Sequence, residues 1–206
     1  MRIALIDYQA GNLTSVKKGF AAVGADLFVP TAPAELPQAN AVVVPGVGHF
    51  AATRNLTTDW VEAIRSSVDK GRPLLGICLG MQWLFEGSEE APECPGLGLL
   101  AGECYRLPSE TNGTSVKIPH VGWNVLDLCR NDSIVSGISP ASQVYFTHSF
   151  AAPTTRDTVA VTDHGQPFAS IVQRDHVAGV QFHPEKSGEV GLKILRNFLR
   201  LVQQER

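Results

Sequence analysis

Residues 73–86 read Pro-Leu-Leu-Gly-Ile-Cys-Leu-Gly-Met-Gln-Trp-Leu-Phe-Glu, and this stretch decides the fold. Its beginning, Pro73–Ile77, is a short apolar run typical of a buried strand, and the pattern predicts a helix directly afterwards, over Gly80–Glu86. A strand that leads at once into a helix is the building block of a parallel sheet. We therefore expect a strand–helix unit here, with Cys78 at its turn.

The same alternation extends along the first half of the chain, whereas the second half is rich in strands. Apolar strands are predicted at 2–6, 25–29 and 41–44, and amphipathic helices from Leu13 to about Gly24, at 59–69 and at about 187–203. Strand-like stretches with little helix between them lie at 97–106, 116–128, 143–150, 157–163, 168–174 and 177–183. The pattern predicts one α/β domain over residues 1–206, with a mostly parallel central sheet, flanking helices and an antiparallel addition in the C-terminal half.

Composition excludes several classes of protein. Seventeen Lys and Arg against twenty Asp and Glu give a net charge of −3, and the basic residues are scattered, which argues against nucleic-acid binding through a basic face. No apolar run approaches the roughly 20 residues of a membrane span. An acid already at Asp7 comes too early for the apolar core of a signal peptide, so we expect a cytoplasmic protein.

The four cysteines stand at 78, 94, 104 and 129, without the paired spacing of a metal site, and are expected to be free thiols. Cys78 has an unusual context, Gly76-Ile77-Cys78-Leu79-Gly80 between a strand and a helix. This is the nucleophile-elbow pattern with cysteine in the serine position. The glycines allow a sharp turn in which a Cβ would collide with the neighbouring strand or helix. A thiol exposed at a helix N-terminus is favoured as the attacking thiolate, whereas the alternative is a buried structural cysteine.

A base and its orienting group are predicted in Gln181-Phe182-His183-Pro184-Glu185. Because positions i and i+2 of an extended chain point to the same side, Glu185 can hold the ring of His183 in one tautomer. Alone, the pair would be a strand-end histidine beside a solvated acid. With Cys78 it predicts a Cys-His-Glu triad.

Oxyanion donors are predicted in two places. Pro45-Gly46-Val47-Gly48 follows an apolar strand and offers backbone N–H groups without bulky side chains, although in isolation it could be merely a turn. The second donor is the N–H of Leu79, directly after the nucleophile.

Together these segments resemble the class I (triad) glutamine amidotransferases, and within them the glutaminase subunits of imidazole glycerol phosphate synthases. The resemblance spans essentially the whole chain. It is carried by Pro-Gly-Val-Gly-x-Phe, Gly-Ile-Cys-Leu-Gly-Met-Gln, Gln-Phe-His-Pro-Glu-Lys-Ser, Pro119-His120-Val121-Gly122-Trp123-Asn124 and Tyr145-Phe146-Thr147-His148-Ser149-Phe150. Gln9 departs from the pattern where glycine is common, and Val121 where methionine is common. The resemblance implies the flavodoxin-like fold of that family.

It also implies an activity, a substrate site and a partner. Glutamine would be hydrolysed through a γ-glutamyl thioester on Cys78, without metal or cofactor, and recognised by Gln82, Glu90, Ser149 and Phe150. Ammonia would pass to a (β/α)8-barrel cyclase in a heterodimer of histidine biosynthesis, yielding imidazole glycerol phosphate and aminoimidazole carboxamide ribotide. The glutaminase would stay idle until the loaded partner docks, because the Pro-Gly-Val-Gly strand does not present its donors by itself.

Residues at the partner surface also follow from the resemblance: Asn12, His120, Trp123, Tyr145 and Lys186. Each has a plainer interpretation, namely a helix cap for Asn12, a core ring for Trp123 or Tyr145, and a solvated charge for Lys186.

Four other functions stay open at this point. The chain could be a different triad glutaminase, such as the ammonia supplier of pyridoxal phosphate synthesis, or a free-standing γ-glutamyl hydrolase. It could be a non-catalytic relative, although such a relative normally lacks one triad residue. A metal enzyme is the weakest alternative, because His183 and Glu185 have no companion ligands nearby in sequence.

Overall fold

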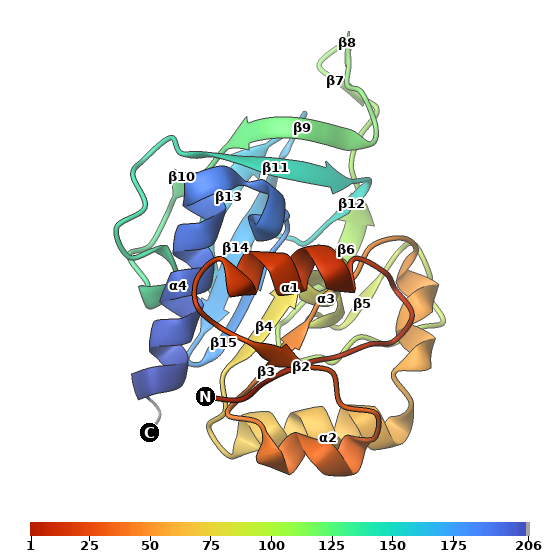
Figure 1. Cartoon of the computed structure of the whole chain (residues 1–206). Helices are drawn as coiled ribbons and strands as arrows, with labels where there is room; N and C mark the ends of the chain where they lie inside the picture. Colours follow the sequence, from red (N-terminus) through yellow and green to blue (C-terminus); the bar gives the residue numbers. More distant parts are fainter. Residues whose placement is uncertain (205–206) are drawn as a thin grey trace.

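An eight-stranded sheet runs through the protein, in the order β10-β13-β14-β15-β4-β3-β1-β2 (Figure 1). The computed structural model describes residues 1–204. The strands of this sheet are β1 (Ile3–Leu5), β2 (Leu27–Phe28), β3 (Ala41–Val44), β4 (Leu74–Ile77), β10 (Asp127–Leu128), β13 (Thr158–Asp163), β14 (Pro167–Arg174) and β15 (Val177–Val180).

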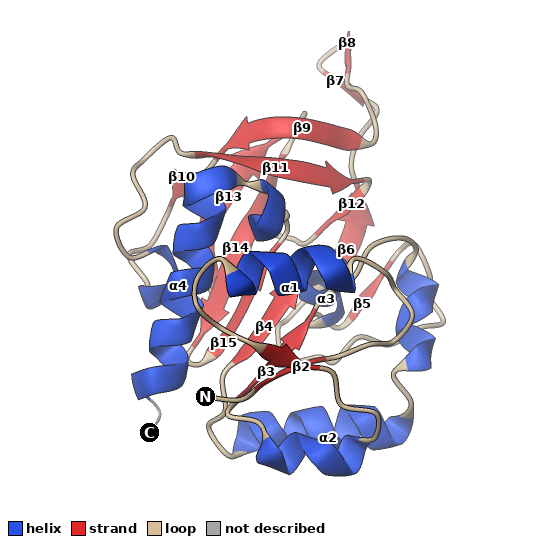
Figure 2. Ribbon diagram, viewed as in Figure 1, coloured by secondary structure: helices blue, strands red, loops and turns tan. Residues whose placement is uncertain are grey.

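The helices, shown in blue in Figure 2, lie on both faces of the sheet. They are α1 (Leu13–Ala21), α2 (Thr58–Asp69), α3 (Leu79–Trp83) and α4 (Gly188–Gln204), with 3-10 turns η1 (Pro33–Gln38), η2 (Phe50–Asn55), η3 (Ser133–Val135) and η4 (Pro184–Lys186). The remaining strands form separate small sheets: β5 (Gly87–Ser88), β6 (Glu103–Arg106), β7 (Glu110–Thr111), β8 (Thr114–Ser115), β9 (His120–Val125), β11 (Gln143–His148) and β12 (Phe150–Ala151).

The predicted fold class is confirmed. Strands β2, β1, β3, β4 and β15 pair in parallel, and β15, β14, β13 and β10 pair antiparallel. Parallel pairing places the carboxyl ends of β3, β4 and β15 at one edge of the sheet. The Pro-Gly-Val-Gly segment, the Cys78 turn and the His183 segment all begin at this edge.

Two apolar cores hold the layers together. Alternate residues of β1 point to opposite faces, so that Ile3 and Leu5 join the core under α1 and α4, while Ala4 joins the core under α2 and α3. Phe20 of α1 and Phe198 of α4 meet edge to face in the first core, with ring centroids 6.3 Å apart. Since both faces of the sheet are covered, its central strands are apolar throughout, as they are in the sequence.

Several predicted boundaries differ from the structure. The strand predicted at 97–106 forms only over Glu103–Arg106, and the helix predicted at 80–86 is the five-residue α3. The strand predicted at 177–183 ends at Val180, and the 3-10 turn η4 follows. Gln9 adopts φ 65°, in the left-handed region that favours glycine, which explains why glycine is common at this position in the resembling family.

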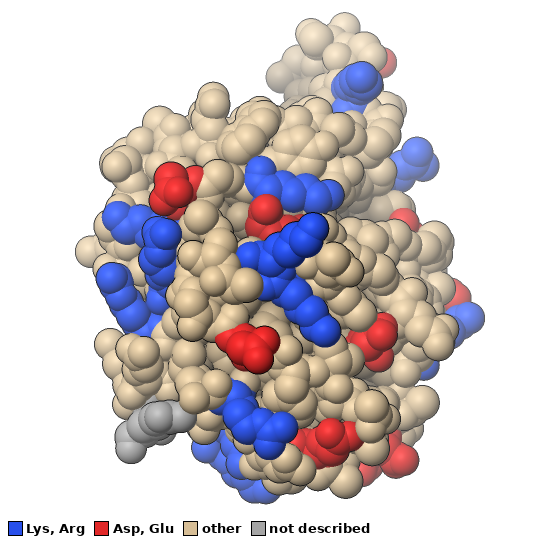
Figure 3. Space-filling model, in the orientation of Figure 1, with Lys and Arg blue, Asp and Glu red and all other residues tan. Residues whose placement is uncertain are grey.

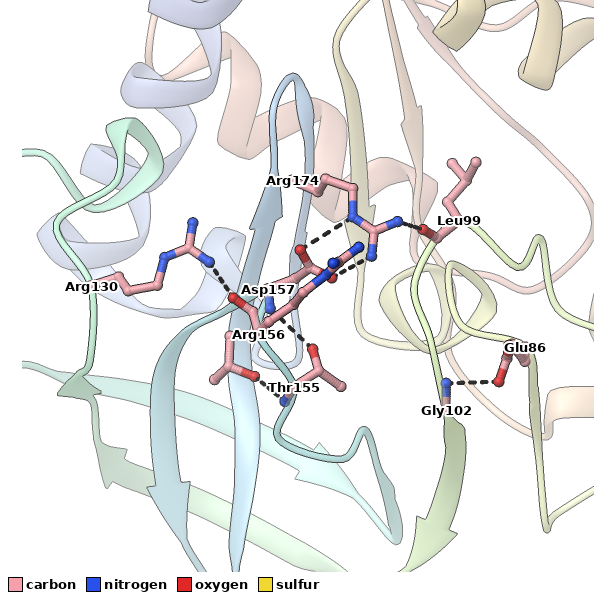
Figure 4. Close-up of polar contacts among 9 residues, drawn as sticks. Glu86, Leu99, Gly102, Arg130, Thr155, Arg156, Asp157 and Arg174 are labelled. Atoms are coloured by element: carbon pink, nitrogen blue, oxygen red, sulfur yellow. Dashed lines mark hydrogen bonds and ion pairs between the residues drawn. The ribbon is translucent and has the colours of Figure 1, made fainter.

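An ion pair between Arg174 and Asp157 holds the open end of the β13–β14 hairpin, opposite its turn (Figure 4). The guanidinium of Arg174 donates to both carboxylate oxygens of Asp157, at 3.2 and 2.5 Å, and to the carbonyl of Leu99. The contact with Leu99 joins the loop between β5 and β6 to the antiparallel half of the sheet. We assign it a structural role, since a fork of this kind holds geometry as well as charge.

The charged side chains form no single-sign field on the face drawn in Figure 3, where Lys and Arg are distributed with Asp and Glu among them. No helix within residues 1–204 combines the length and the apolar character that crossing a membrane requires.

Candidate active site

Cys78 lies at the tight turn between β4 and α3. Its backbone adopts φ 53° and ψ −109°, a conformation that side-chain-bearing residues rarely occupy, and its N–H donates to the Val180 carbonyl at 2.8 Å. Strain of this kind persists only where the surrounding structure enforces it, and it is concentrated at functional sites. The residue is 5% exposed, so its thiol is reachable only through a small opening.

Two glycines make this turn sterically feasible. A Cβ on Gly76 would lie 2.6 Å from the Gly80 carbonyl oxygen, and a Cβ on Gly80 would lie 1.8 Å from the carbonyl oxygen of Val44. The collisions predicted from the elbow pattern therefore exist, and both involve backbone atoms that cannot move aside cheaply.

His183 and Glu185 form a buried pair. His183 Nδ1 donates to Glu185 Oε1 at 2.9 Å, and the side chains are 0% and 1% exposed. The pairing agrees with the prediction, but its local geometry does not, because Glu185 reaches the ring from the 3-10 turn η4 and not from an extended strand. With Nδ1 donating, the neutral ring has its lone pair on Nε2, which is buried and makes no hydrogen bond within residues 1–204.

The pair favours a charged imidazolium. Burial by itself lowers the pKa of His183, but the neighbouring Cys78 and the Glu185 carboxylate outweigh it and raise the pKa to about 9. Burial likewise tends to raise the pKa of Glu185, and its hydrogen bonds with His183 and Asn12 bring it below its usual value. A ring that carries a proton on Nε2 near neutral pH can protonate a leaving amine.

Asn12 is part of this hydrogen-bond group. Its side-chain Nδ2 donates to Glu185 Oε1 at 2.6 Å, and it makes no cap hydrogen bond to α1 although it precedes that helix. Its half-buried amide thus points at the Glu185 carboxylate, so the helix-cap interpretation does not describe its side chain, and its place at a partner surface stays a prediction.

Replacing Asn12 with glycine is expected to lower kcat for glutamine hydrolysis about tenfold, since one hydrogen bond to a charged group is lost and the His183–Glu185 pair loosens. Glycine suits the left-handed backbone at this position, φ 68°, so the effect reports on the side chain. The matched control is Asn112→Gly, at φ 51° in the remote turn between β7 and β8. A kcat equal to that of the control would contradict this role.

A pocket of about 280 Å³ opens beside Cys78. It is lined by Gly48, Cys78, Leu79, Gln82, Glu90, Pro119, Thr147, His148, Ser149 and Phe150. The structure thus places all four predicted glutamine-binding residues around the thiol, although they come from segments far apart in sequence. A small pocket with a few convergent polar groups suits a polar metabolite.

Two of the pocket residues are held in place by hydrogen bonds. Gln82 Nε2 donates to the Phe150 carbonyl at 2.8 Å and to Gln181 Oε1 at 3.1 Å. One oxygen of Glu90 accepts from the N–H of Phe50 at 2.7 Å. The carboxylate therefore has a fixed position at the pocket wall, where it can attract a substrate ammonium.

Two of the predicted oxyanion donors, the N–H groups of Leu79 and Val47, are occupied. The Leu79 N–H donates to the Gly46 carbonyl at 3.3 Å, and the Val47 N–H donates to the Ala10 carbonyl at 2.9 Å. The Gly46 carbonyl and the Val47 N–H belong to one trans peptide group and point in opposite directions. The orientation of this peptide group therefore has two effects: its carbonyl occupies the Leu79 N–H, and its own Val47 N–H points away from the thiol.

The family model for class-I glutamine amidotransferases matches residues 4–202. The chain belongs to this family. A curated relative from Syntrophotalea carbinolica, imidazole glycerol phosphate synthase subunit HisH, is 45% identical over 95% of this chain and 98% of its own length. A protein of the same name from Thermosynechococcus vestitus is 47% identical, over 98% and 97% of the two chains.

Solved structures share the fold at lower identity. A crystal structure of a glutamine amidotransferase has a TM-score of 0.74 at 19% identity and covers 97% of this chain and 98% of its own. A putative GMP synthase component from Thermoplasma acidophilum has a TM-score of 0.72 at 19% identity, with coverage of 99% and 94%.

The residues predicted at the partner surface of this class-I amidotransferase divide into two groups. Trp123, at 55% exposure, meets Tyr145 across the β9–β11 ribbon with ring centroids 6.2 Å apart, and Lys186 Nζ lies 6.0 Å from the Tyr145 ring. With Val121, at 54% exposure, these residues form an exposed apolar and cationic patch. Trp123 is thus not a core ring, and a large exposed tryptophan is typical of an interface.

His120 is different, because its ring is only 3% exposed. Its expected surface position is therefore wrong for the side chain. His120 Nδ1 hydrogen-bonds to His148 Nε2 at 3.0 Å, and His148 Nδ1 donates to the Phe150 carbonyl at 2.9 Å. Burial lowers the pKa of His120 to about 4 and that of His148 to about 3. Both rings are therefore neutral and act as a structural link between the ribbon and the pocket.

No cluster of three or more His, Cys, Asp or Glu side chains suited to a metal ion occurs in the described part of the chain. Gln181 is a residue of the amidotransferase site that the sequence pattern does not identify; it is fully buried, and its Nε2 lies 3.7 Å from Cys78 Sγ. Its position in the motif Gln-Phe-His-Pro-Glu was a signal, but only the fold shows that a strand-end glutamine faces the thiol.

Of the other cysteines, Cys94 and Cys104 are buried free thiols and Cys129 is exposed.

Proposed function

We propose that this chain is the glutaminase subunit of an imidazole glycerol phosphate synthase, hydrolysing L-glutamine to glutamate and ammonia. One observation carries the proposal: a single pocket joins the strained Cys78 to Gln82, Glu90, Ser149 and Phe150, beside the buried His183–Glu185 pair. The relatives named as subunit HisH of that synthase, at 45% and 47% identity over nearly the whole chain, support the choice among glutaminases.

The chemistry assigns one step to each group. The Cys78 thiolate attacks the carboxamide carbon, and the carbonyl oxygen takes the negative charge. His183 gives its Nε2 proton to the amide nitrogen, which leaves as ammonia, and a γ-glutamyl thioester remains on Cys78. His183 then removes a proton from water, which attacks the thioester and releases glutamate. Glu185 keeps the ring oriented and its positive charge stabilised in both steps.

Oxyanion stabilisation requires the Gly46–Val47 peptide to turn over. That turn moves the Gly46 carbonyl away from Leu79 and brings the Val47 N–H to the pocket, so two donors become available together. Losing one such donor typically costs about 10²–10³ in rate. Because both donors are occupied in this chain, we propose that it idles alone and is switched on when the partner binds.

The proposed partner is a (β/α)8-barrel cyclase that docks on the Val121–Trp123–Tyr145–Lys186 patch and receives the ammonia. Two hydrogen bonds connect this patch with the segment that carries His183, since the His183 N–H donates to the Tyr145 carbonyl at 3.0 Å and the Tyr145 N–H donates to the side-chain Oγ of Ser187 at 3.0 Å. Docking on the ribbon can thus reach the catalytic segment through two hydrogen bonds. We also propose that residues 1–206 act as one amidotransferase domain, located in the cytoplasm.

Reconstitution tests the proposal. The barrel cyclase alone should make imidazole glycerol phosphate from its nucleotide with free ammonia only, and adding this chain should let glutamine replace ammonia. Glutamine-dependent synthesis that appears instead with a pyridoxal phosphate synthase would assign the chain to another amidotransferase.

A further inference from the structure

Tyr8 has a buried hydroxyl group without a partner. The residue is 3% exposed, and its hydroxyl is buried and makes no hydrogen bond within residues 1–204. A buried polar group left unpaired destabilises the fold, so such a group in a native structure calls for an explanation. The rest of the residue is well fixed, since the side chain of Asn55 donates to the Tyr8 carbonyl at 3.0 Å.

This hydroxyl lies directly against the peptide that blocks the oxyanion site. The position of a Cβ on Gly46 is only 2.0 Å from the Tyr8 hydroxyl oxygen, which is the nearest atom to it, and the Leu79 Cβ follows at 3.0 Å. Glycine at 46 therefore leaves room for the phenol. Burial raises the pKa of Tyr8 far above neutrality, so the group stays protonated and can donate at any physiological pH.

The turned peptide would need a donor at this place. In the resting chain the Gly46 carbonyl accepts from Leu79, and the Val47 N–H faces the carbonyl of Ala10. When the peptide turns over, the Gly46 carbonyl loses the Leu79 N–H and moves to the side of the Ala10 carbonyl. Two carbonyl oxygens facing each other repel, unless a donor lies between or beside them.

We infer that Tyr8 is a positioning residue for the oxyanion strand, whose hydroxyl donates to the Gly46 carbonyl once the Gly46–Val47 peptide has turned over. The inference rests on the proposed function and extends it. The hydroxyl is unpaired in the idle state and paired in the active one, so it biases the equilibrium toward the active state. Tyr8 does not line the pocket beside Cys78, so it acts through the donors that it helps to present.

Tyr8→Phe removes only this hydroxyl. We expect kcat for glutamine hydrolysis by the chain alone to fall about tenfold, the effect of one lost hydrogen bond on the active population, with KM unchanged. The melting temperature of the free chain should stay the same or rise, because the hydroxyl has no partner there. Tyr105→Phe is the matched control, since its hydroxyl donates to the Pro167 carbonyl at 3.1 Å outside the pocket.

The inference is overturned if Tyr8→Phe keeps the wild-type kcat, or if kcat falls together with a melting temperature several degrees lower, which would indicate a structural hydroxyl. The outcome for the proposed function is read separately, from stimulation of the wild-type chain by the cyclase. A wild-type chain that hydrolyses no glutamine under any condition would overturn both.

Discussion

Glutamate production by the Cys78→Ala variant is expected to fall at least about 10³-fold below that of the wild-type chain, since removing the nucleophile of a catalytic triad eliminates the covalent route. Alanine keeps the Cβ and differs only by the sulfur, so the strained turn at φ 53° is retained. The measurement is glutamate formed at saturating glutamine, with the cyclase and its nucleotide present.

The control for this variant is Cys129→Ala, which removes an exposed thiol from the loop after β10. It should leave the rate unchanged. If Cys78→Ala retained most of the wild-type activity, the thioester route would be wrong, and the pocket would belong to a binding protein or to a different hydrolytic mechanism.

The second large effect is on stability. Gly80→Ala is expected to lower the free energy of unfolding by about 3 kcal/mol or more, because its Cβ would lie 1.8 Å from the Val44 carbonyl oxygen. Neither β3 nor α3 can move away without disturbing both the Pro-Gly-Val-Gly strand and the Cys78 turn. Urea unfolding of the variant measures the loss.

Gly87→Ala provides the comparison, since the nearest atom to its Cβ would be Glu103 Oε1 at 3.6 Å, an ordinary contact. We expect that variant to unfold within about 1 kcal/mol of the wild-type chain. Equal stability of the Gly80 and Gly87 variants would show that the elbow does not require glycine for steric reasons.

The sequence was most informative where local geometry restricts the residue type. The Gly76–Gly80 elbow could be predicted because only glycine fits against the backbone there, and apolar strands identified the sheet because both of its faces are covered. In both cases the residues that determine the local structure lie within one short stretch of sequence, so the stretch alone predicts the structure. The His183–Glu185 pairing was also predicted, although from an extended chain and not from the 3-10 turn that forms it.

Contacts between distant segments could not be predicted in this way. Asn12 and Glu185 are 173 residues apart, and nothing near Asn12 distinguishes a triad partner from a helix cap. The same holds for His120. Its side chain points to the opposite face of β9 from the exposed side chains of Val121 and Trp123, but only the packing of β9 with β11 and the core shows which of the two faces is buried. The occupied oxyanion donors depend on the direction of one peptide group, which side-chain patterns do not encode.

The central claim is that the chain has a complete triad but a closed oxyanion site, which the partner opens. The most direct measurement is glutamate production by the purified chain alone and with the barrel cyclase plus its nucleotide. Two donors become available together, so we predict stimulation of at least about 10²-fold, abolished by Cys78→Ala. A chain that alone hydrolyses glutamine as fast as the loaded complex would contradict the account.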